Sequence, residues 1–358
     1  RTDIEVSEYC LGTMTWGTQT PEEDAHNQIE RAYDAGINFL DTAEMYPVNP
    51  VLAETVGVTE TIIGNWNAKS GRRADWIIAT KHSGANGGFV REGRGIHADT
   101  VRNAVDGSLR RLQTDYIDLY QFHWPNRGSY HFRQNWGYDP TNQPSRSEIV
   151  DNMNGVMEVL KAMVDEGKIR AFGLSNDSAW GTMNWLAAAE EIGGPRVATM
   201  QNEYSLLCRL YDTDMAELAV HEDVTLLAFS PLATGFLTGK YQGGQIPEAS
   251  RMSINSGMGG RNSKRVFDAV AVYLDIAQRH GIDPVHFALQ WTRSRPFPTI
   301  PIFGATTSDQ LDAILGGGFD AEGEVAVVGL VQVECQQLVF RVALLQPPRQ
   351  PGFAQLAA

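Results

Sequence analysis

The chain has 358 residues, of which 42% are hydrophobic, and its formal net charge at pH 7 is -14. This length and apolar content suffice for a buried core, either in one large α/β domain or in two smaller ones. The acidic balance excludes a nucleic-acid partner, because phosphate recognition needs clustered Lys and Arg. It favours a protein that stays dispersed in water.

Cysteine usage and apolar runs narrow the class further. Cys10, Cys208 and Cys335 lie far apart with no CxxC spacing, so neither a disulfide framework nor a metal site is expected. The most apolar run, Val325–Leu345, is interrupted by charged and amide side chains, whereas a membrane-spanning helix needs about 20 residues with few charges. We therefore expect a protein of the reducing cytoplasm that does not associate with membranes.

Short apolar strands alternate with helices along most of the chain. Pro21 and the three acids after it open the first helix, since proline suits the first turn and acids suit its positive end, and Gly36 ends it. In chain order we expect strand Cys10–Thr13, helix 21–35, strand Asn38–Leu40, helix Thr59–Ala68, strand Trp76–Thr80, helix 99–112, strand Tyr116–Phe122, helix Ser147–Glu166, strand Ile169–Leu174, helix Ala179–Glu191, strand Val197–Met200, helix Thr213–His221, strand Val224–Phe229, helices Ser263–His280 and Pro284–Arg293, and strand Thr299–Ile302.

This alternation predicts the class of fold. Strands that are apolar on both faces, joined by crossover helices, imply an all-parallel sheet, and eight such units fit a closed (β/α)8 TIM barrel. The alternative is an open doubly wound sheet, which normally carries a glycine-rich strand–turn–helix fingerprint in its first unit. The segment Gly12–Gly17 does not match that fingerprint, so the barrel is favoured.

Two long segments interrupt the alternation and predict long active-site loops. Trp124–Ser147 carries five aromatic residues among Gly, Asn, Pro and Gln. It leaves the fourth strand on the side where barrel active sites lie, which fits a lid, and an interface patch is the alternative. Gly239–Asn262 is rich in Gly and Ser and contains Arg251 and Arg261.

Polar side chains stand where the expected strands end. The carboxyl ends of all strands in a parallel barrel face one mouth, so their convergence there predicts a ligand site. The phenol Tyr46 lies in the loop five residues after Asp41, the first of these strand-end residues. The strand-end residues are Asp41, Lys81, His123, Ser175, Asn176, Gln201, Phe229, Ser230 and Gly304–Thr307.

Four of these groups together suit carbonyl reduction. A phenol has a pKa of about 10, which a nearby ammonium lowers, so Tyr46 is the candidate acid with Lys81 as its charge partner. Asp41 can hold Lys81 in place, and His123 can orient the substrate oxygen. Taken singly, an Asp–Lys pair is usually a weak surface ion pair and a strand-end histidine is usually structural. Side chains carry no hydride, so a nicotinamide is required. His82 points away from this side of its strand and is not expected to be catalytic.

At these residues the chain resembles the aldo-keto reductase superfamily, most closely its bacterial Tas-like branch, from about Arg1 to Leu311. The resemblance implies that Asp41, Tyr46, Lys81 and His123 are the catalytic tetrad, with Tyr46 as the acid. The motifs that carry it are Leu11–Gly17, Gly36–Tyr46, Ala79–Lys81, Leu112–Tyr120, His123–Pro125, Gly167–Arg170, Gly173–Asn176 and Gly304–Leu311.

The same resemblance implies an NADP(H) site. The matching residues, from the nicotinamide to the adenosine phosphate, are Ser175, Asn176, Gln201, Phe229, Ser230, Leu232, Gly235, Gly304, Thr306, Thr307 and Gln310. The first three match positions that hold the carboxamide, Phe229 matches the aromatic that stacks on the ring, the next three line the pyrophosphate and the last four the adenosine phosphate. Gln310 stands where some members carry Arg for the 2′-phosphate, and Arg251 is the candidate substitute.

Both ends of the chain depart from the family pattern. The N-terminal hairpin that closes the barrel bottom is expected to be truncated, and residues 1–315 are expected to form the barrel. The segment 316–358 is an atypical C-terminal tail, for which a shifted reading frame in the source sequence is one hypothesis.

We expect an NADPH-dependent enzyme that interconverts carbonyl compounds and alcohols, with a small-molecule substrate in a flat apolar pocket beside Trp16 and Trp124. The alternatives are an NADP(H)-binding regulatory or sensor protein with little turnover and, more weakly, a barrel isomerase or lyase that needs no nicotinamide.

Overall fold

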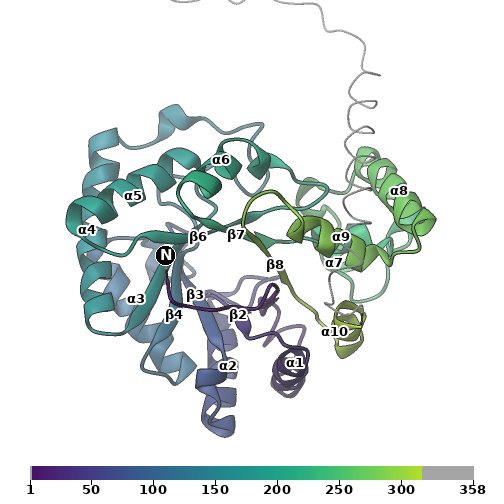
Figure 1. Ribbon diagram of the computed structural model, residues 1–358, viewed down its shortest axis with the longest axis horizontal. Coiled ribbons are helices and arrows are strands. Elements are labelled where there is room, and N and C mark those ends of the chain that lie inside the picture. Colours follow the sequence, from purple (N-terminus) through teal and green to yellow (C-terminus); the bar gives the residue numbers. More distant parts are fainter. Residues whose placement is uncertain (1, 317–358) are drawn as a thin grey trace, which may run out of the picture.

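In the computed structural model, which describes residues 2–316, eight parallel strands form one closed barrel in chain order with helices around it (Figure 1). The first and last strands pair with each other, Cys10 opposite Ile302 and Leu11 opposite Phe303, so the sheet has no free edge. This closure confirms the (β/α)8 prediction over the open sheet. The strands are β1 (Cys10–Gly12), β2 (Phe39–Asp41), β3 (Ile77–His82), β4 (Ile117–Phe122), β5 (Ile169–Ser175), β6 (Val197–Glu203), β7 (Thr225–Phe229) and β8 (Thr299–Phe303).

The helices also follow the predicted order. They are α1 (Glu22–Asp34), α2 (Val58–Ser70), α3 (Ala98–Leu112), α4 (Arg146–Asp165), α5 (Ala179–Ile192), α6 (Asp214–His221), α7 (Arg251–Ile254), α8 (Lys264–Arg279), α9 (Pro284–Arg293) and α10 (Ser308–Leu315). Helices α7 and α10 were not predicted from the sequence. For α10 a signal was present, since the Thr307 side chain accepts the Gln310 N–H at 3.3 Å as an N-cap. None of the helices among residues 2–316 is both long and apolar enough to cross a bilayer.

Two apolar layers hold the barrel together. The larger one lies between the outer face of the strands and the helices, where burying one large apolar side chain contributes roughly 1.5–3 kcal/mol. Inside the barrel, Ile4 and Val6 of the N-terminal segment pack against a smaller core. That inner core consists of Cys10, Phe39, Ala79, Leu119, Ala171, Leu227 and Ile302. The barrel interior is therefore filled, and the polar strand-end residues project from this filled base. The predicted tail lies outside the described residues, apart from Gly316.

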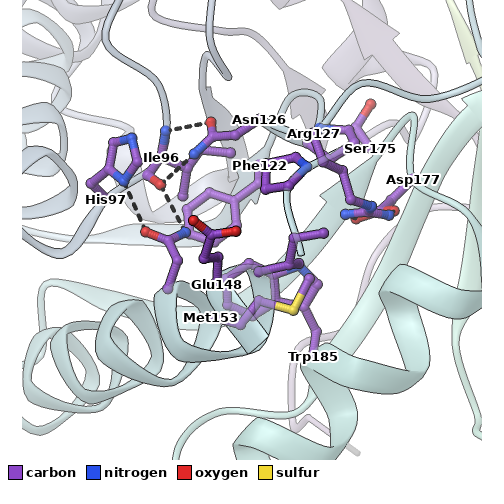
Figure 2. A pocket seen from close by; sticks show the side chains of 14 residues that line it. Ile96, His97, Phe122, Asn126, Arg127, Glu148, Met153, Ser175, Asp177 and Trp185 are labelled. Carbon is purple, nitrogen blue, oxygen red and sulfur yellow. Dashed lines mark hydrogen bonds and ion pairs between the residues drawn. The ribbon is translucent and has the colours of Figure 1, made fainter. Parts of the chain in front are cut away.

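A cavity of about 270 Å³ lies outside the barrel wall, where β4 and β5 end and α4 begins (Figure 2). Phe122, the last residue of β4, and Ser175, the last residue of β5, line its wall. The neighbouring His123 belongs to the barrel mouth. The end of β4 therefore separates two distinct environments.

Candidate active site

Strands β2 and β3 bring a carboxylate and an ammonium into direct contact at the barrel mouth. The Lys81 Nζ donates to the Asp41 carboxylate at 2.5 Å and to the Thr42 carbonyl at 2.7 Å. Lys81 has no exposed surface, and Asp41 is 3% exposed. An ion pair this deeply buried depends on complete hydrogen bonding, because removing charges from water is costly. The local geometry meets that demand.

The second carboxylate oxygen of Asp41 is also fully engaged. It accepts the Gln201 amide at 2.8 Å and the Gln121 amide at 3.1 Å. The two amides also contact each other, with the Gln201 nitrogen 3.2 Å from the Gln121 oxygen. Gln121 was not predicted, although it lies two residues before His123 on the same strand and strand side chains repeat every two residues. Gln201 was expected beside a cofactor, and the structure places it against Asp41.

The loop after β2 carries Tyr46 back over this ion pair. Its carbonyl accepts the Gly57 N–H at 3.1 Å and the Thr59 N–H at 3.4 Å, both at the start of α2. The Lys81 Nζ lies 5.0 Å from the centroid of the phenol ring. Tyr46 is 8% exposed, so most of its surface is buried.

His123 completes the group from the end of β4. Its ring lies 5.7 Å from the Tyr46 ring, edge to face, and its own backbone N–H donates to the His82 carbonyl at 2.9 Å. The buried Nδ1 has no hydrogen-bond partner among residues 2–316. Burial, reinforced by the Lys81 charge, holds the pKa of His123 well below its ordinary value. The imidazole is therefore neutral.

The direction of the pKa shift of Tyr46 differs from the sequence-based expectation that a nearby ammonium lowers it. Burial raises the pKa of its hydroxyl, and the lowering effect of the Lys81 charge is too small to reverse this. For Lys81 itself, burial opposes the charge, but the Asp41 carboxylate outweighs it and the pKa is raised. Tyr46 is thus held as a neutral phenol and Lys81 as a cation. The pKa is raised and not lowered because the phenol loses contact with water, an effect that the position of Lys81 in the sequence does not show.

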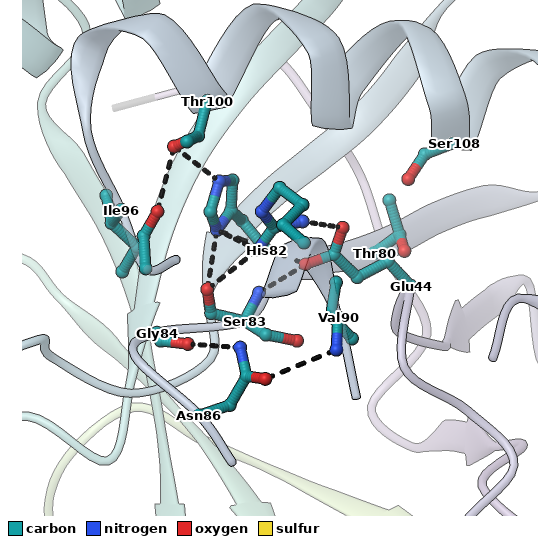
Figure 3. Close-up of polar contacts among 12 residues, drawn as sticks. Glu44, Thr80, His82, Ser83, Gly84, Asn86, Val90, Ile96, Thr100 and Ser108 are labelled. Carbon is teal, nitrogen blue, oxygen red and sulfur yellow. Dashed lines mark hydrogen bonds and ion pairs between the residues drawn. The ribbon is translucent and has the colours of Figure 1, made fainter. Parts of the chain in front are cut away.

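A second buried acid braces the loop that carries Tyr46 (Figure 3). The Glu44 carboxylate accepts the Ser83 N–H at 2.6 Å and the Arg91 guanidinium at 2.5 Å, which joins the β2 loop to the end of β3. Burial opposes the charge on Glu44, but nearby His82 and Arg91 outweigh it and its pKa is lowered. His82 lies on the outer face of β3, with its Nε2 3.3 Å from the Thr100 hydroxyl, and takes no part in the mouth.

The ends of β5 and β6 form a polar cradle beside the tetrad. The Ser175 hydroxyl donates to the Gln201 carbonyl at 2.7 Å, and the Asn176 amide donates to the His123 carbonyl at 2.9 Å. Asn176 is 1% exposed, and its side-chain carbonyl Oδ1 is buried with no partner among residues 2–316. A buried acceptor without a donor is costly, so this position is suited to a ligand that supplies an N–H.

Proteins of known family were found that resemble this chain in sequence over most of its length. The family model described as Aldo/keto reductase family matches residues 8–321. This chain belongs to that family. Protein tas of Escherichia coli (strain K12) is 44% identical over 311 residues, which cover 86% of this chain and 88% of that protein. The uncharacterized oxidoreductase YrpG of Bacillus subtilis (strain 168) is 32% identical over 323 residues, or 87% of each chain.

A more distant relative carries a different kind of name. A putative voltage-gated potassium channel subunit beta of Schizosaccharomyces pombe is 28% identical over 329 residues, covering 87% of this chain and 84% of that protein. Membership of the aldo/keto reductase family makes the present chain an NAD(P)H-dependent oxidoreductase. The segments after β7 and β8 are therefore the places to look for a fit to a dinucleotide.

The segment after β7 carries two basic side chains that lack an acidic partner among residues 2–316. Gly235 has a φ of 94°, which favours glycine, and an added Cβ would lie 2.6 Å from the Lys240 side chain. Neither Lys240 nor Arg251 forms an ion pair with any acid in the described part of the chain, residues 2–316. Burial lowers the pKa of Arg251, and the nearby Arg261 charge adds to this effect. Phosphate groups would supply the missing negative charge, so this segment of the aldo/keto reductase fits a dinucleotide. Lys240 was not singled out from the sequence.

The segment after β8 presents open backbone and one helix start. Gly304 is exposed, and an added Cβ would lie 3.0 Å from the Gly12 carbonyl. The Gln310 side chain turns back and accepts the Thr306 N–H and hydroxyl, both at 3.1 Å. Gln310 is therefore engaged at the start of α10 instead of reaching outward as a long cation would.

The two tryptophans expected in the substrate pocket lie in different places. Trp16 has no exposed surface and donates its indole N–H to Gln28 of α1 at 3.2 Å, so it packs between barrel and helix instead of lining the mouth. Trp124 stands beside His123, with ring centroids 4.8 Å apart, and donates to the Ala85 carbonyl at 2.9 Å. Of the two tryptophans, only Trp124 borders the tetrad of this aldo/keto reductase.

Proposed function

We propose that this protein reduces aldehydes or ketones to alcohols with NADPH, and that Tyr46 is the proton donor. The observation that carries the proposal is the buried Lys81–Asp41 contact of 2.5 Å with the Tyr46 and His123 rings beside it. A phenol, an ammonium, a carboxylate and a neutral imidazole at one barrel mouth match the demands of carbonyl reduction. The physiological substrate class is a small carbonyl compound that fits beside Trp124.

The protein side chains divide the chemistry among them. His123, as a neutral imidazole, donates a hydrogen bond to the carbonyl oxygen and orients it. Tyr46 gives its proton to that oxygen as negative charge develops there, and Lys81 stabilises the tyrosinate that remains. Asp41 keeps Lys81 charged and fixed in position. A bound nicotinamide supplies the hydride that no side chain can provide.

Three groups of residues would hold the cofactor. Ser175, Asn176 and Gln201 would bind the nicotinamide carboxamide, and the unpartnered Asn176 Oδ1 supports this role because it lacks a donor. Phe229 would stack on the ring, with Ser230, Leu232 and Gly235 along the pyrophosphate. Arg251 and Lys240, which form no ion pair with an acid among residues 2–316, favour NADPH over NADH, since the 2′-phosphate adds charge. The residues at the adenosine end would be Gly304, Thr306, Thr307 and Gln310.

The deciding experiment removes one oxygen atom. Tyr46→Phe should lower kcat by about 10²- to 10⁴-fold, because the acid is lost, while the dissociation constant for NADPH changes little. Tyr120→Phe is the matched control, since that buried hydroxyl has no partner among residues 2–316 and should be dispensable. Initial rates with a panel of aldehydes and fluorescence titration of NADPH measure the two quantities. Wild-type turnover in Tyr46→Phe would disprove the assignment.

A regulatory role is the second candidate, favoured by the similarity to a protein named as a potassium channel beta subunit. It predicts tight NADPH binding with negligible turnover on any carbonyl compound. Single-turnover measurements separate the two functions, because a sensor would retain bound NADPH in the presence of aldehydes. Rapid consumption of NADPH would reject the purely regulatory role.

A further inference from the structure

The cavity behind the end of β4 lies on the other side of that strand end from the catalytic mouth and shares Ser175 with the proposed cofactor site. No proton or hydride transfer of the proposed reaction takes place in it. Phe122 lines the cavity, while the next residue, His123, stands at the mouth, because side chains on a strand alternate between faces. Its volume of about 270 Å³ is large enough for a small organic molecule. The cavity therefore has the size of a binding site of its own.

Apolar side chains make most of the wall. The Phe122 and Trp185 rings lie 5.2 Å apart, and both side chains are buried, which gives the cavity an aromatic floor. Figure 2 shows Met153 near Trp185 on the same side of the cavity. The remaining apolar lining residues are Ile96, Pro125, Pro144 and Ile149. Such a wall favours a flat hydrocarbon body, as in most small-molecule sites.

One side of the cavity presents a hydrogen-bond acceptor. The Asn152 amide nitrogen donates to the Ile96 carbonyl at 3.1 Å, which fixes the orientation of that amide. Its oxygen, 2.8 Å from the His97 Nδ1, must then accept from an Nδ1–H. In the neutral ring the Nε2 of His97 is consequently an acceptor, and it has no hydrogen-bond partner among residues 2–316. Figure 2 shows His97 among the residues that line the cavity.

A carboxylate supplies a second acceptor together with negative charge. The Glu148 Oε2 accepts the Ser145 hydroxyl at 2.6 Å and the Ser145 N–H at 2.9 Å, as in a helix capping box. The other oxygen, Oε1, makes no hydrogen bond to any of the described residues. Arg127, the cation among the lining residues, is already held by Asp177. The Glu148 and His97 side chains are exposed, so their Oε1 and Nε2 atoms offer acceptors at the open rim of the cavity.

We propose that this cavity binds a small amine that carries an aromatic or compact apolar body. The ammonium would donate to Glu148 Oε1 and His97 Nε2, and the body would lie against Phe122 and Trp185. A carboxylate or phosphate ligand is disfavoured, because Glu148 would repel it and Arg127 is already paired. This assignment stands apart from the proposed carbonyl reduction and does not depend on it.

Calorimetric titration of the full chain with 2-phenylethylamine tests the proposal, with 3-phenylpropionate as the acid of similar shape. We expect a dissociation constant of about 1 mM or tighter for the amine and at least tenfold weaker binding of the acid. Glu148→Gln should weaken the amine about tenfold, since Gln retains the capping box but removes the charge. Glu158→Gln, an exposed acid on the same helix, should leave binding unchanged.

Two further readouts locate the bound amine. Ile149→Trp fills the cavity from α4 and should abolish binding, whereas an amine bound at the catalytic mouth would be unaffected. A crystal soaked with 4-bromophenylethylamine should show the bromine anomalous peak between Phe122 and Met153, which tests the site without any substitution. No binding of the amine, equal binding of the acid, undiminished binding in Ile149→Trp or a bromine peak elsewhere would each overturn the proposal.

Discussion

Two charged clusters at the barrel mouth differ in the elements that hold them. The first cluster, Asp41 with Lys81, is carried by neighbouring strands and is almost entirely excluded from water. The second joins two long loops: the Glu203 carboxylate at the end of β6 accepts Arg133 of the loop after β4 at 2.7 Å and Arg261 of the segment after β7 at 2.5 Å. The Arg133 side chain is 32% exposed, whereas Glu203 and Arg261 are buried, so water reaches this second cluster on the Arg133 side alone.

The difference in burial and in the supporting elements predicts a different role for each cluster. Strand-borne charges in a dry environment hold a fixed geometry, and losing one partner leaves an uncompensated buried charge that costs about 3–5 kcal/mol. In the loop-borne cluster water screens the Arg133 charge, so its loss costs less and mainly loosens the segments that the cluster joins. We therefore expect substitutions in the first cluster to affect chemistry and those in the second to affect closure.

The largest effect should follow from Lys81→Met. It should lower kcat about 10³-fold and destabilise the fold by several kcal/mol, because Asp41 would be left buried without its cation. The double variant Asp41→Asn with Lys81→Met should regain most of the stability but none of the activity. Steady-state kinetics and chemical denaturation measure both quantities, and Lys161→Met, at an exposed ion pair, is the control. Recovered activity in the double variant would contradict the catalytic role of the pair.

A buried histidine on β3 should make stability depend on pH. Burial holds the pKa of His82 at about 4, whereas an unfolded histidine titrates near pH 6.5. Below pH 6.5 His82 binds a proton in the unfolded chain but stays neutral in the folded chain. The free energy of unfolding therefore falls as the pH drops from 6.5 towards 4. The loss attributable to this residue is about 3 kcal/mol.

Denaturation of the His82→Gln variant between pH 4 and pH 8 checks this expectation. The substitution should flatten the fall in unfolding free energy across that window. An identical slope in His82→Gln and wild type would show that another group governs acid sensitivity.

Glu203→Gln should have a smaller effect of a different kind. With the carboxylate charge removed, Arg133 and Arg261 lose their common partner, and we expect KM for the carbonyl substrate to rise about tenfold with little change in kcat. Trypsin should cleave the two loops faster, as followed by mass spectrometry. Glu222→Gln removes an ion pair with Arg196 outside these loops and should change neither measurement. A selective fall in kcat would place Glu203 in the chemistry instead.

The smallest effect is expected from Trp136→Ser in the loop after β4. This side chain is 95% exposed, so its removal should change the free energy of unfolding by less than about 0.5 kcal/mol. Thermal denaturation of the two proteins suffices as the measurement. A fall in substrate affinity without a change in stability would identify Trp136 as part of a lid that closes over substrate.

Local sequence patterns were enough to predict the strands and the residues at their ends. All eight strands were located because each is a short apolar run between turn signals, and the residues after them could be read off directly. Gln121 escaped notice because it lies within a strand, and only its neighbours across the barrel give it a role. The placement of Trp16 was wrong because an aromatic residue after a strand can pack inward or outward, and the contact with Gln28 of α1 decides between them.

By itself, the sequence determined the order of strands and helices, the closed barrel and the candidate residues, because periodicity and strand ends are local properties. Only the tertiary structure decided the protonation of Tyr46 and His123, the bracing of Asp41 by two amides and the acceptors around the outer cavity. Each of these depends on how much water neighbouring elements exclude. That exclusion arises from segments distant in the chain packing together, which no local pattern records.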